Sequence, residues 1–472
     1  MFEGQLNSRL LLCVFVSSLG ASFQNGYNIG VINSPQATIE TWIAQVIAER
    51  QGIAQADVPA TTITFIWSGI VAIYCVGGMM GAVSTKFVAE TFGRKGGLLF
   101  SNVLVVIAAL LLGFAKPVKV FEMLLIGRLV IGIYCGLNAG LCPMYLNEIS
   151  PVSIRGAIGS VFQLILTIAI MVAQIMSMEW FMGTEALWPY LLAFILVPGI
   201  IQCALLPFCA ESPRYLFITK ELETETTETL TWLRDSEDVE EEVQGLRAER
   251  DALQEMEVVT LKDMFQISVL RKPLIISCVV MMSQQFSGIN AVMYFSTHIF
   301  NEASLSMSES QLATLGMGTI NVLMTVVSLV LVEMAGRRVL LFIGYAGMCG
   351  TTVLLTICLI YVDAELWVAY FTILLVIIFV VFFATGPGSI PWFLVAEMFG
   401  QSARSTATSV AVLVNWTCNF IVAIGFLPLQ NVLGSYVFVI FVILLAIFAA
   451  YVFFQVPETK GRTIEEVTAL FT

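Results

Sequence analysis

One stretch of the chain places three amide side chains in an apolar setting where they could bind a solute. The segment 272–299 is apolar and long enough to cross a bilayer, yet it contains Gln284, Gln285 and Asn290. Amides both donate and accept hydrogen bonds, so they match a neutral solute that is rich in hydroxyl groups. The same amides could instead bridge neighbouring helices. These residues alone leave both interpretations open.

The same stretch contains a weak point in the predicted helix. Ser287 and Gly288 follow the paired glutamines, and glycine in a helix costs about 1 kcal/mol relative to alanine. We therefore expect the helix to flex at Gly288. Tyr294 lies beyond this point and is a candidate lid over the amides, or else an ordinary interface aromatic.

The composition is that of a membrane protein built from helices. Of 472 residues, 58% are hydrophobic and 12% are charged, whereas a soluble domain carries about 25% charged residues. Long apolar runs recur throughout, which indicates an all-α polytopic membrane protein in a lipid bilayer rather than a β-barrel. The net charge of -12 comes largely from the Glu-rich stretch 221–263, and it indicates no nucleic-acid partner.

Few side chains are available for catalysis or for metal binding. All ten cysteines lie in or beside apolar segments and are interpreted as small buried hydrophobes. His298 is the only histidine, which excludes histidine-based catalytic pairs and metal clusters. We find no nucleophile–base pair and no phosphate-binding loop, so we expect no enzyme activity, no cofactor and no metal.

Twelve segments are predicted to span the membrane. They cover residues 10–30, 63–85, 97–115, 121–142, 156–176, 188–208, 272–299, 311–332, 339–361, 367–395, 406–426 and 434–455. This pattern predicts four parts: an N-terminal six-helix bundle (1–208), a cytosolic helical linker (209–271), a C-terminal six-helix bundle (272–455) and a cytosolic tail (456–472). All but four (Arg50, Lys116, Lys119, Arg128) of the 22 Lys and Arg then lie on the cytosolic side, which favours cytosolic termini.

Three sequence signals occur in the same order in both halves, each at a cytosolic helix end, and predict two homologous bundles. The pairs are Gly93-Arg94-Lys95 and Gly336-Arg337-Arg338, Glu148 with Arg155 and Glu397 with Arg404, and Glu211-Ser212-Pro213-Arg214 and Pro457-Glu458-Thr459-Lys460.

Their charges suggest a gate. We expect glutamates and arginines to pair across the two halves and to hold the inner side shut when the outer side is open, and we expect these pairs to separate in the opposite state. Several pairs of about 0–1 kcal/mol each suit a barrier that must open. The alternative is that these charges only fix the topology. The predicted gating residues of this face are Arg94, Glu148, Arg155, Glu211, Arg214, Glu333, Arg337, Arg338, Glu397 and Arg404.

These motifs together resemble those of the sugar-porter branch of the major facilitator superfamily, and within it the facilitative hexose transporters. The resemblance also rests on Arg155-Gly156-Ala157, Gly288-Ile289-Asn290-Ala291, Gly386-Pro387-Gly388 and Ile390-Pro391-Trp392. It covers residues 10 to 470 and implies two six-helix bundles around a central monosaccharide site, which work by alternating access at the plasma membrane.

The resemblance also implies which residues contact the sugar. These are Gln163, Gln284, Gln285, Asn290, Asn321 and Asn415, with Trp392 and Trp416 as an aromatic wall. All lie within apolar spans and none is charged, which suits hydroxyl groups and C–H faces. Individually, interhelical bonding or packing would also explain them. Pro387 and Gly388 should break the tenth span and form a hinge beside the site.

Proton coupling needs an ionisable group in the pathway. Asn28 stands where the similar proton-coupled sugar porters carry an aspartate, and Arg128 lies deep in a span without the acidic partner of those symporters. We therefore expect a uniporter rather than a proton symporter. A non-transporting sugar sensor is a third hypothesis, although such sensors tend to carry long signalling tails.

These residues leave more than one hexose open as the substrate. At position 392, after Ile390-Pro391, the chain has a tryptophan and in this resembles the glucose-handling members of the family. Met281-Met282-Ser283 stands where those members have Gln-Leu-Ser, and Ala384 where they have glutamate; each loss removes a hydroxyl partner worth about 1 kcal/mol. We favour glucose, with fructose or mixed hexose transport as the alternative.

Overall fold

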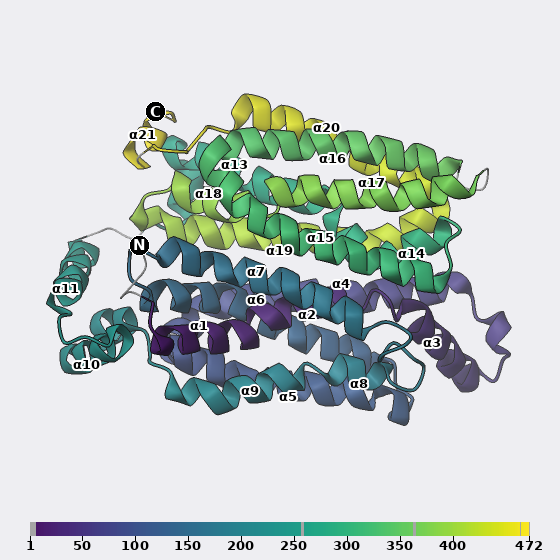
Figure 1. The fold of residues 1–472 in the computed structure, drawn as a ribbon, viewed down its shortest axis with the longest axis horizontal. Coiled ribbons are helices and arrows are strands. Elements are labelled where there is room, and N and C mark those ends of the chain that lie inside the picture. The colour runs from purple at the N-terminus through teal and green to yellow at the C-terminus, as the bar shows by residue number, and fades with distance from the viewer. Residues whose placement is uncertain (1–5, 256–258, 362–364, 463, 472) are drawn as a thin grey trace.

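The protein is an all-helical molecule made of two bundles that lie side by side. The computed structural model describes residues 6–255, 259–361, 365–462 and 464–471, and these contain helices but no strand. In Figure 1 the N-terminal bundle (purple to blue) lies below the C-terminal bundle (green to yellow), with the helices of both roughly parallel to the long axis.

Each bundle contains helices that are long and apolar. The N-terminal bundle contains α1 (Ser8–Gly20), α2 (Ser22–Gly30), α4 (Ala60–Thr91), α5 (Arg94–Val118), α6 (Glu122–Ile149), α7 (Arg155–Met176), α8 (Trp188–Ala193) and α9 (Leu196–Leu205). The C-terminal bundle contains α13 (Ser268–Phe286), α14 (Ile289–Glu302), α15 (Met307–Ala335), α16 (Arg337–Ile360), α17 (Leu366–Thr385), α18 (Ile390–Met398), α19 (Gln401–Leu433) and α20 (Val437–Gln455).

Eleven segments of the described chain are long and apolar enough to cross a membrane. The last of them, Ser402–Gln455, has 54 residues, which at 1.5 Å per residue far exceeds a hydrocarbon core of about 30 Å. It contains α19 and α20, which meet at the 3-10 turn Gly434–Tyr436. The predicted number of twelve is reached when these two helices are counted as separate passes.

Two predicted spans are not continuous helices, which the sequence patterns did not indicate. The first divides at Ala21 into α1 and α2, and the sixth divides near Phe194 into α8 and α9. Pro198 explains the second break, because it cannot donate to the carbonyl four residues earlier. Side chains of α2 bond to carbonyls near that break: Gln24 Nε2 donates to Ile195 O (2.6 Å) and Tyr27 Oη to Leu191 O (2.7 Å).

The two ends of the molecule differ. The linker end carries both chain ends and the helices α10 (Glu223–Arg234), α11 (Glu240–Glu255), α12 (Leu261–Gln266) and α21 (Ile464–Ala469). The loop end carries α3 (Gln36–Gln51) at the opposite side of Figure 1. Between the bundles, α4 packs against α19 and α7 packs against α15. A site between the halves must therefore be lined by these helices and by their broken neighbours.

Candidate substrate-binding site

The seventh span breaks where the sequence predicts. The helix α13 ends at Phe286 and α14 begins at Ile289, with Gly288 at φ 90°. This left-handed conformation favours glycine, and a Cβ at Gly288 would also come within 3.0 Å of the Phe441 ring. The break turns the end of α13 so that its last polar residues face the interior of the bundle.

Four of the predicted amides form one network at this break. Asn415 Nδ2 donates to Gln284 Oε1 (2.9 Å), and Gln285 Nε2 donates to Asn415 Oδ1 (3.0 Å). Asn290 Nδ2 donates to Gln285 Oε1. Gln284, Gln285 and Asn415 are each at most 6% exposed, and Asn290 is half-buried. The two spans that hold these amides thus present a continuous row of donors and acceptors.

The same network contacts the break in the tenth span. Helix α17 ends at Thr385 and α18 begins at Ile390. Gln284 Nε2 donates to the carbonyls of Pro387 (3.0 Å) and Gly388 (2.9 Å), which lie in that break. Bending the tenth span therefore changes the partners of a predicted sugar contact.

The break in the tenth span is also packed tightly against α16. A Cβ at Gly386 would lie 2.5 Å from the Leu340 carbonyl oxygen, and one at Gly344 would lie 2.3 Å from Pro387 Cδ. Both contacts join the break to α16, which therefore packs directly against it.

Gln163 and Asn321 lie outside this network. Gln163 is half-buried on α7, and Asn321 is 5% exposed on α15. Among the described residues, neither side-chain amide has a hydrogen-bond partner. The helices α7 and α15 face each other across the two bundles, so these amides are placed where a ligand between the halves could bind them.

The two predicted aromatic residues have different surroundings. Trp392 is 39% exposed, whereas Trp416 is 8% exposed. The Trp416 ring packs edge-on against Tyr74 (centroids 5.9 Å apart), and a Cβ at Gly78 would lie 2.6 Å from it. Trp416 therefore fills the contact between the two bundles, while Trp392 keeps an accessible face.

The linker end contains two copies of one charged arrangement. In the N-terminal half, Glu148 pairs with Arg94 (2.7 Å) and Arg214 (3.4 Å) and accepts from Ser212 Oγ. Glu211 accepts from the backbone N–H groups of Arg94 (3.1 Å) and Lys95 (3.0 Å) at the start of α5, where a carboxylate is favoured by the helix dipole.

The C-terminal half repeats this arrangement. Glu397 pairs with Arg337 (2.9 Å) and accepts from Thr459 Oγ1 (2.5 Å). Glu458 accepts from the N–H groups of Arg337 (2.9 Å) and Arg338 (3.1 Å) at the start of α16. Glu333 also pairs with Arg337, at 3.5 Å.

Among the described residues, these charges form no pair across the two halves. The prediction places such pairs in the state that is shut at the linker end and separates them in the opposite state, so the gating role stays a prediction. Every ion pair resolved among the described residues stays within one half and the segment that follows it. Arg155 and Arg404 bond to no glutamate in the described part of the chain. Arg155 donates to Ser150 O (3.4 Å) and Arg404 to Phe399 O (3.3 Å). Seven-residue spacing identified equivalent residues but not their partners.

Known proteins resemble this chain over almost its whole length. The family model described as "Sugar (and other) transporter" matches residues 13–471. The facilitated glucose transporter member 3 of Ovis aries is 44% identical over 467 residues, which cover 99% of this chain and 93% of the relative. Member 1 of Gallus gallus is also 44% identical, over 99% of this chain and 94% of the relative.

The chain belongs to the sugar transporter family. Its fold is that of a major facilitator superfamily transporter, and it is not an enzyme. The inward-open xylose transporter XylE from E. coli superposes with a TM-score of 0.81 at 24% identity, covering 98% of this chain and 100% of XylE. The XylE structure bound to 6-bromo-6-deoxy-D-glucose gives a TM-score of 0.77 at 24% identity, over 98% and 99% of the two chains.

In this transporter Arg128, the most buried arginine among the described residues, lies next to Asn28. Arg128 is 1% exposed, and its Nη1 donates to the Asn28 carbonyl (3.0 Å). Its guanidinium lies over the Tyr74 ring, 4.5 Å from the centroid. It forms no ion pair among the described residues. The surroundings of Arg128 are thus a carbonyl and an aromatic face, not a carboxylate that could titrate.

The loop end joins the two bundles through uncharged groups, which the sequence reasoning missed. Asn33 Nδ2 donates to Met293 O (2.8 Å) and Ser296 Oγ (2.6 Å), and Asn33 Oδ1 accepts from the Thr297 N–H (3.0 Å). Glu179 N–H donates to Gln311 Oε1 (3.2 Å). Sequence patterns could not indicate these bonds, because the partners of Asn33 are about 260 residues away in the chain.

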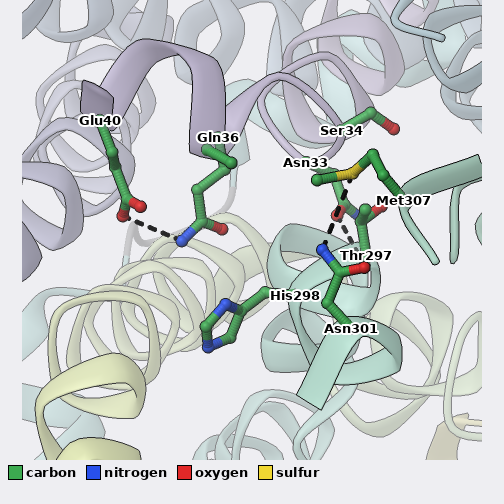
Figure 2. Close-up of a pocket in the computed structure, with 9 residues that line it drawn as sticks. Asn33, Ser34, Gln36, Glu40, Thr297, His298, Asn301 and Met307 are labelled. Atoms are coloured by element: carbon green, nitrogen blue, oxygen red, sulfur yellow. Dashed lines mark hydrogen bonds between the residues drawn. The ribbon is translucent and has the colours of Figure 1, made fainter. Parts of the chain in front are cut away.

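Tyr294 is also part of this closed end. It is fully buried and shares a hydrogen bond with the Asn419 side chain (3.3 Å). Figure 2 shows the neighbouring cavity of about 30 Å³, where α3 meets α14. Gln36 donates to Glu40 (3.0 Å) there, and His298 lies on the facing helix. At the loop end, therefore, the two bundles are in direct contact and are joined by hydrogen bonds.

Proposed function

We propose that the chain is a facilitative uniporter of hexose, with D-glucose as the leading substrate, that works by alternating access in the plasma membrane. The observation that carries this proposal is the amide network around Gln284, which is bonded to the backbone of the broken tenth span. Sugar bound by these amides would be coupled directly to the bending of that span. The relatives described as facilitated glucose transporters support the choice of sugar.

The surroundings of Arg128 favour uniport over proton symport. A coupled transporter needs a group whose charge changes during the cycle, and Asn28 cannot supply one. Both termini and the linker end are proposed to be cytosolic, because most Lys and Arg lie there. The loop end is then extracellular, and the structure corresponds to a state closed to the outside.

The sugar contacts proposed are Gln163, Gln284, Gln285, Asn290, Asn321, Asn415 and Trp392, with Trp416 completing the wall from the bundle contact. Among the described residues, the side-chain amides of Gln163 and Asn321 have no hydrogen-bond partner, and Trp392 is 39% exposed, so these three side chains can bind sugar in this state. Ala384 is buried and supplies no carboxylate, so the glucose preference rests on the amides and on Trp392. Fructose is the alternative substrate for this reason.

Counterflow uptake in proteoliposomes tests the proposal. Liposomes loaded with unlabelled glucose should transiently accumulate labelled glucose, and the parallel fructose experiment ranks the two sugars. Absence of counterflow with both sugars would remove the transport function and favour a sensor. Sustained accumulation of sugar driven by an imposed pH gradient would replace uniport with proton symport.

The role of Gln284 is tested by Gln284→Ala. The variant leaves the Pro387 and Gly388 carbonyls without this donor, at a free-energy cost of about 1–3 kcal/mol. We therefore expect Vmax/KM for glucose to fall about 30-fold. Thr325→Val is a matched control, because Thr325 is a buried polar residue whose hydroxyl, among the described residues, donates to the carbonyl of Asn321 in its own helix. Equal kinetics of Gln284→Ala and Thr325→Val would exclude Gln284 from the site.

A further inference from the structure

A glutamine on α7 is buried at the contact between the bundles, and its side-chain amide has no hydrogen-bond partner among the described residues. Gln174 is 1% exposed, and both Nε2 and Oε1 are enclosed. An amide buried in this way costs about 1–3 kcal/mol by mutational data. By contrast, Gln202 in the core of the same bundle accepts from Asn102 Nδ2 (2.8 Å). Gln174 therefore holds unused hydrogen-bonding capacity in this state.

The amide is pressed against the other half of the transporter. A Cβ at Gly318 on α15 would lie 1.9 Å from Gln174 Oε1. One residue further along α15, Thr319 Oγ1 donates to Met171 Sδ of α7 (3.6 Å). The amide is thus enclosed by the contact between α7 and α15, and it is released when these helices separate at the loop end.

On both helices, the residues of this contact lie on the same face as a predicted sugar contact. Gln174 lies 11 residues after Gln163 on α7, which is about three helical turns and therefore the same face. Gly318 and Asn321 lie three residues apart on α15, and residues at this spacing are neighbours on a helix surface. Gln174 therefore lies on the face of α7 that carries Gln163, nearer to the end of the helix at Met176.

We propose that Gln174 is a further sugar-binding residue, on the outer access path, that contacts the hexose only while the loop end is open. A sugar hydroxyl can donate to the amide oxygen and accept from the amide nitrogen at the same time. The closed state leaves both atoms unpaired, so opening and sugar contact satisfy them together. This inference deepens the proposed hexose transport and rests on it.

The test is Gln174→Met, which keeps the length of the side chain and removes both polar atoms. In proteoliposomes with the loop end facing outward, we would measure the apparent affinity for external glucose and for the set of glucose analogues that each lack one hydroxyl. The variant should bind glucose about 5- to 10-fold more weakly, consistent with the loss of a hydrogen bond. One analogue should lose the penalty that it shows with the wild type.

The pattern across the analogues separates contact from a simple change in the conformational equilibrium. If Gln174 acted only by destabilising the closed state, every sugar would weaken by one common factor, and the proposal would be overturned. Unchanged affinity for all sugars would overturn it as well. If Gln174→Met is not recovered folded, Gln174→Leu provides the same comparison.

Met171→Leu is the matched control, because it alters the same contact with α15 without removing an amide, and it should leave the analogue pattern unchanged. Wild-type protein that shows no counterflow of any hexose would instead refute the proposed function, so the two failures are distinguishable.

Discussion

The two ends of the transporter hold their helices together in opposite ways. At the linker end, buried or half-buried charges pair within each half, and the arrangement around Glu148 is repeated around Glu397. At the loop end, uncharged groups such as Asn33 bond from one half to the other, without a repeat. Charged pairs thus connect helices within each half, whereas neutral hydrogen bonds join the two halves at the loop end.

The largest expected effect is at Glu148. Its carboxylate and the Arg94 guanidinium are 7% and 8% exposed, and removing one partner of such a pair costs about 3 kcal/mol. Glu148→Gln should therefore lower the melting temperature of purified protein more than Glu397→Gln, since Glu397 is 29% exposed. Both can be measured by thermal unfolding in detergent.

The double variant tests whether the two networks are independent. Because they lie in separate halves, the free-energy effects of Glu148→Gln and Glu397→Gln should add within about 0.5 kcal/mol. A larger coupling would show that the charges of the two halves contact each other in solution, and the contrast between the ends would then fail.

A smaller effect, on conformation rather than on stability, is expected at Asn33. Asn33→Ala removes three hydrogen bonds between the halves, worth about 1 kcal/mol each. The population that is open at the loop end should rise by tenfold or more, which labelling of a cysteine introduced below the closure would report. Ser34→Ala on the neighbouring residue is the control. A population that does not change would show that the closure depends on packing alone.

The smallest effect is a pH dependence at Glu40. Burial beside α14 raises the pKa of the Glu40 carboxyl to about 7, partly offset by the hydrogen bond from Gln36. When the loop end opens, Glu40 regains solvent and its pKa falls towards the ordinary value near 4.5. The closed state is therefore destabilised above pH 7 by a buried charge, and proton uptake relieves this as the external pH falls from 7 towards 5.

His298 and Glu302 are the other titratable groups that face this region from α14. Sugar uptake from the loop-end side should accordingly decrease modestly on external acidification. Glu40→Gln should reduce that dependence, and His298→Gln serves to remove the contribution of the imidazole. A pH profile of Glu40→Gln that matches the wild type would assign the effect to other groups.

The sequence predicted the helical fold and several features of the site because their signals are local. Paired amides next to Gly288, and glycines around Pro387, are unusual in an apolar helix wherever it packs. The structure brings Gln284, Gln285, Asn290 and Asn415 together through a helix break that the sequence also predicted.

The features that the sequence did not indicate are contacts between residues that are far apart in the chain. Glu148 and Arg155 are near each other in sequence, but Glu148 pairs with Arg94 and Arg214, which are 54 and 66 residues away. The bond from Asn33 to Ser296 joins residues 263 apart. Helical periodicity predicts which face of a helix is buried, but not which residue of another helix that face contacts. The partners in both networks could therefore be identified only from the three-dimensional structure.

The glutamates that cap α5 and α16 affect when each six-helix bundle can finish folding. Glu211 reaches back 117 residues to the N–H of Arg94, and Glu458 reaches back 121 residues to that of Arg337. During synthesis, neither bundle can gain this cap until the segment after its sixth span has emerged from the ribosome. A split version of the protein should therefore be cut within the linker beyond Arg214 rather than at residue 208, because a cut at 208 would separate Glu211 from the helix that it caps.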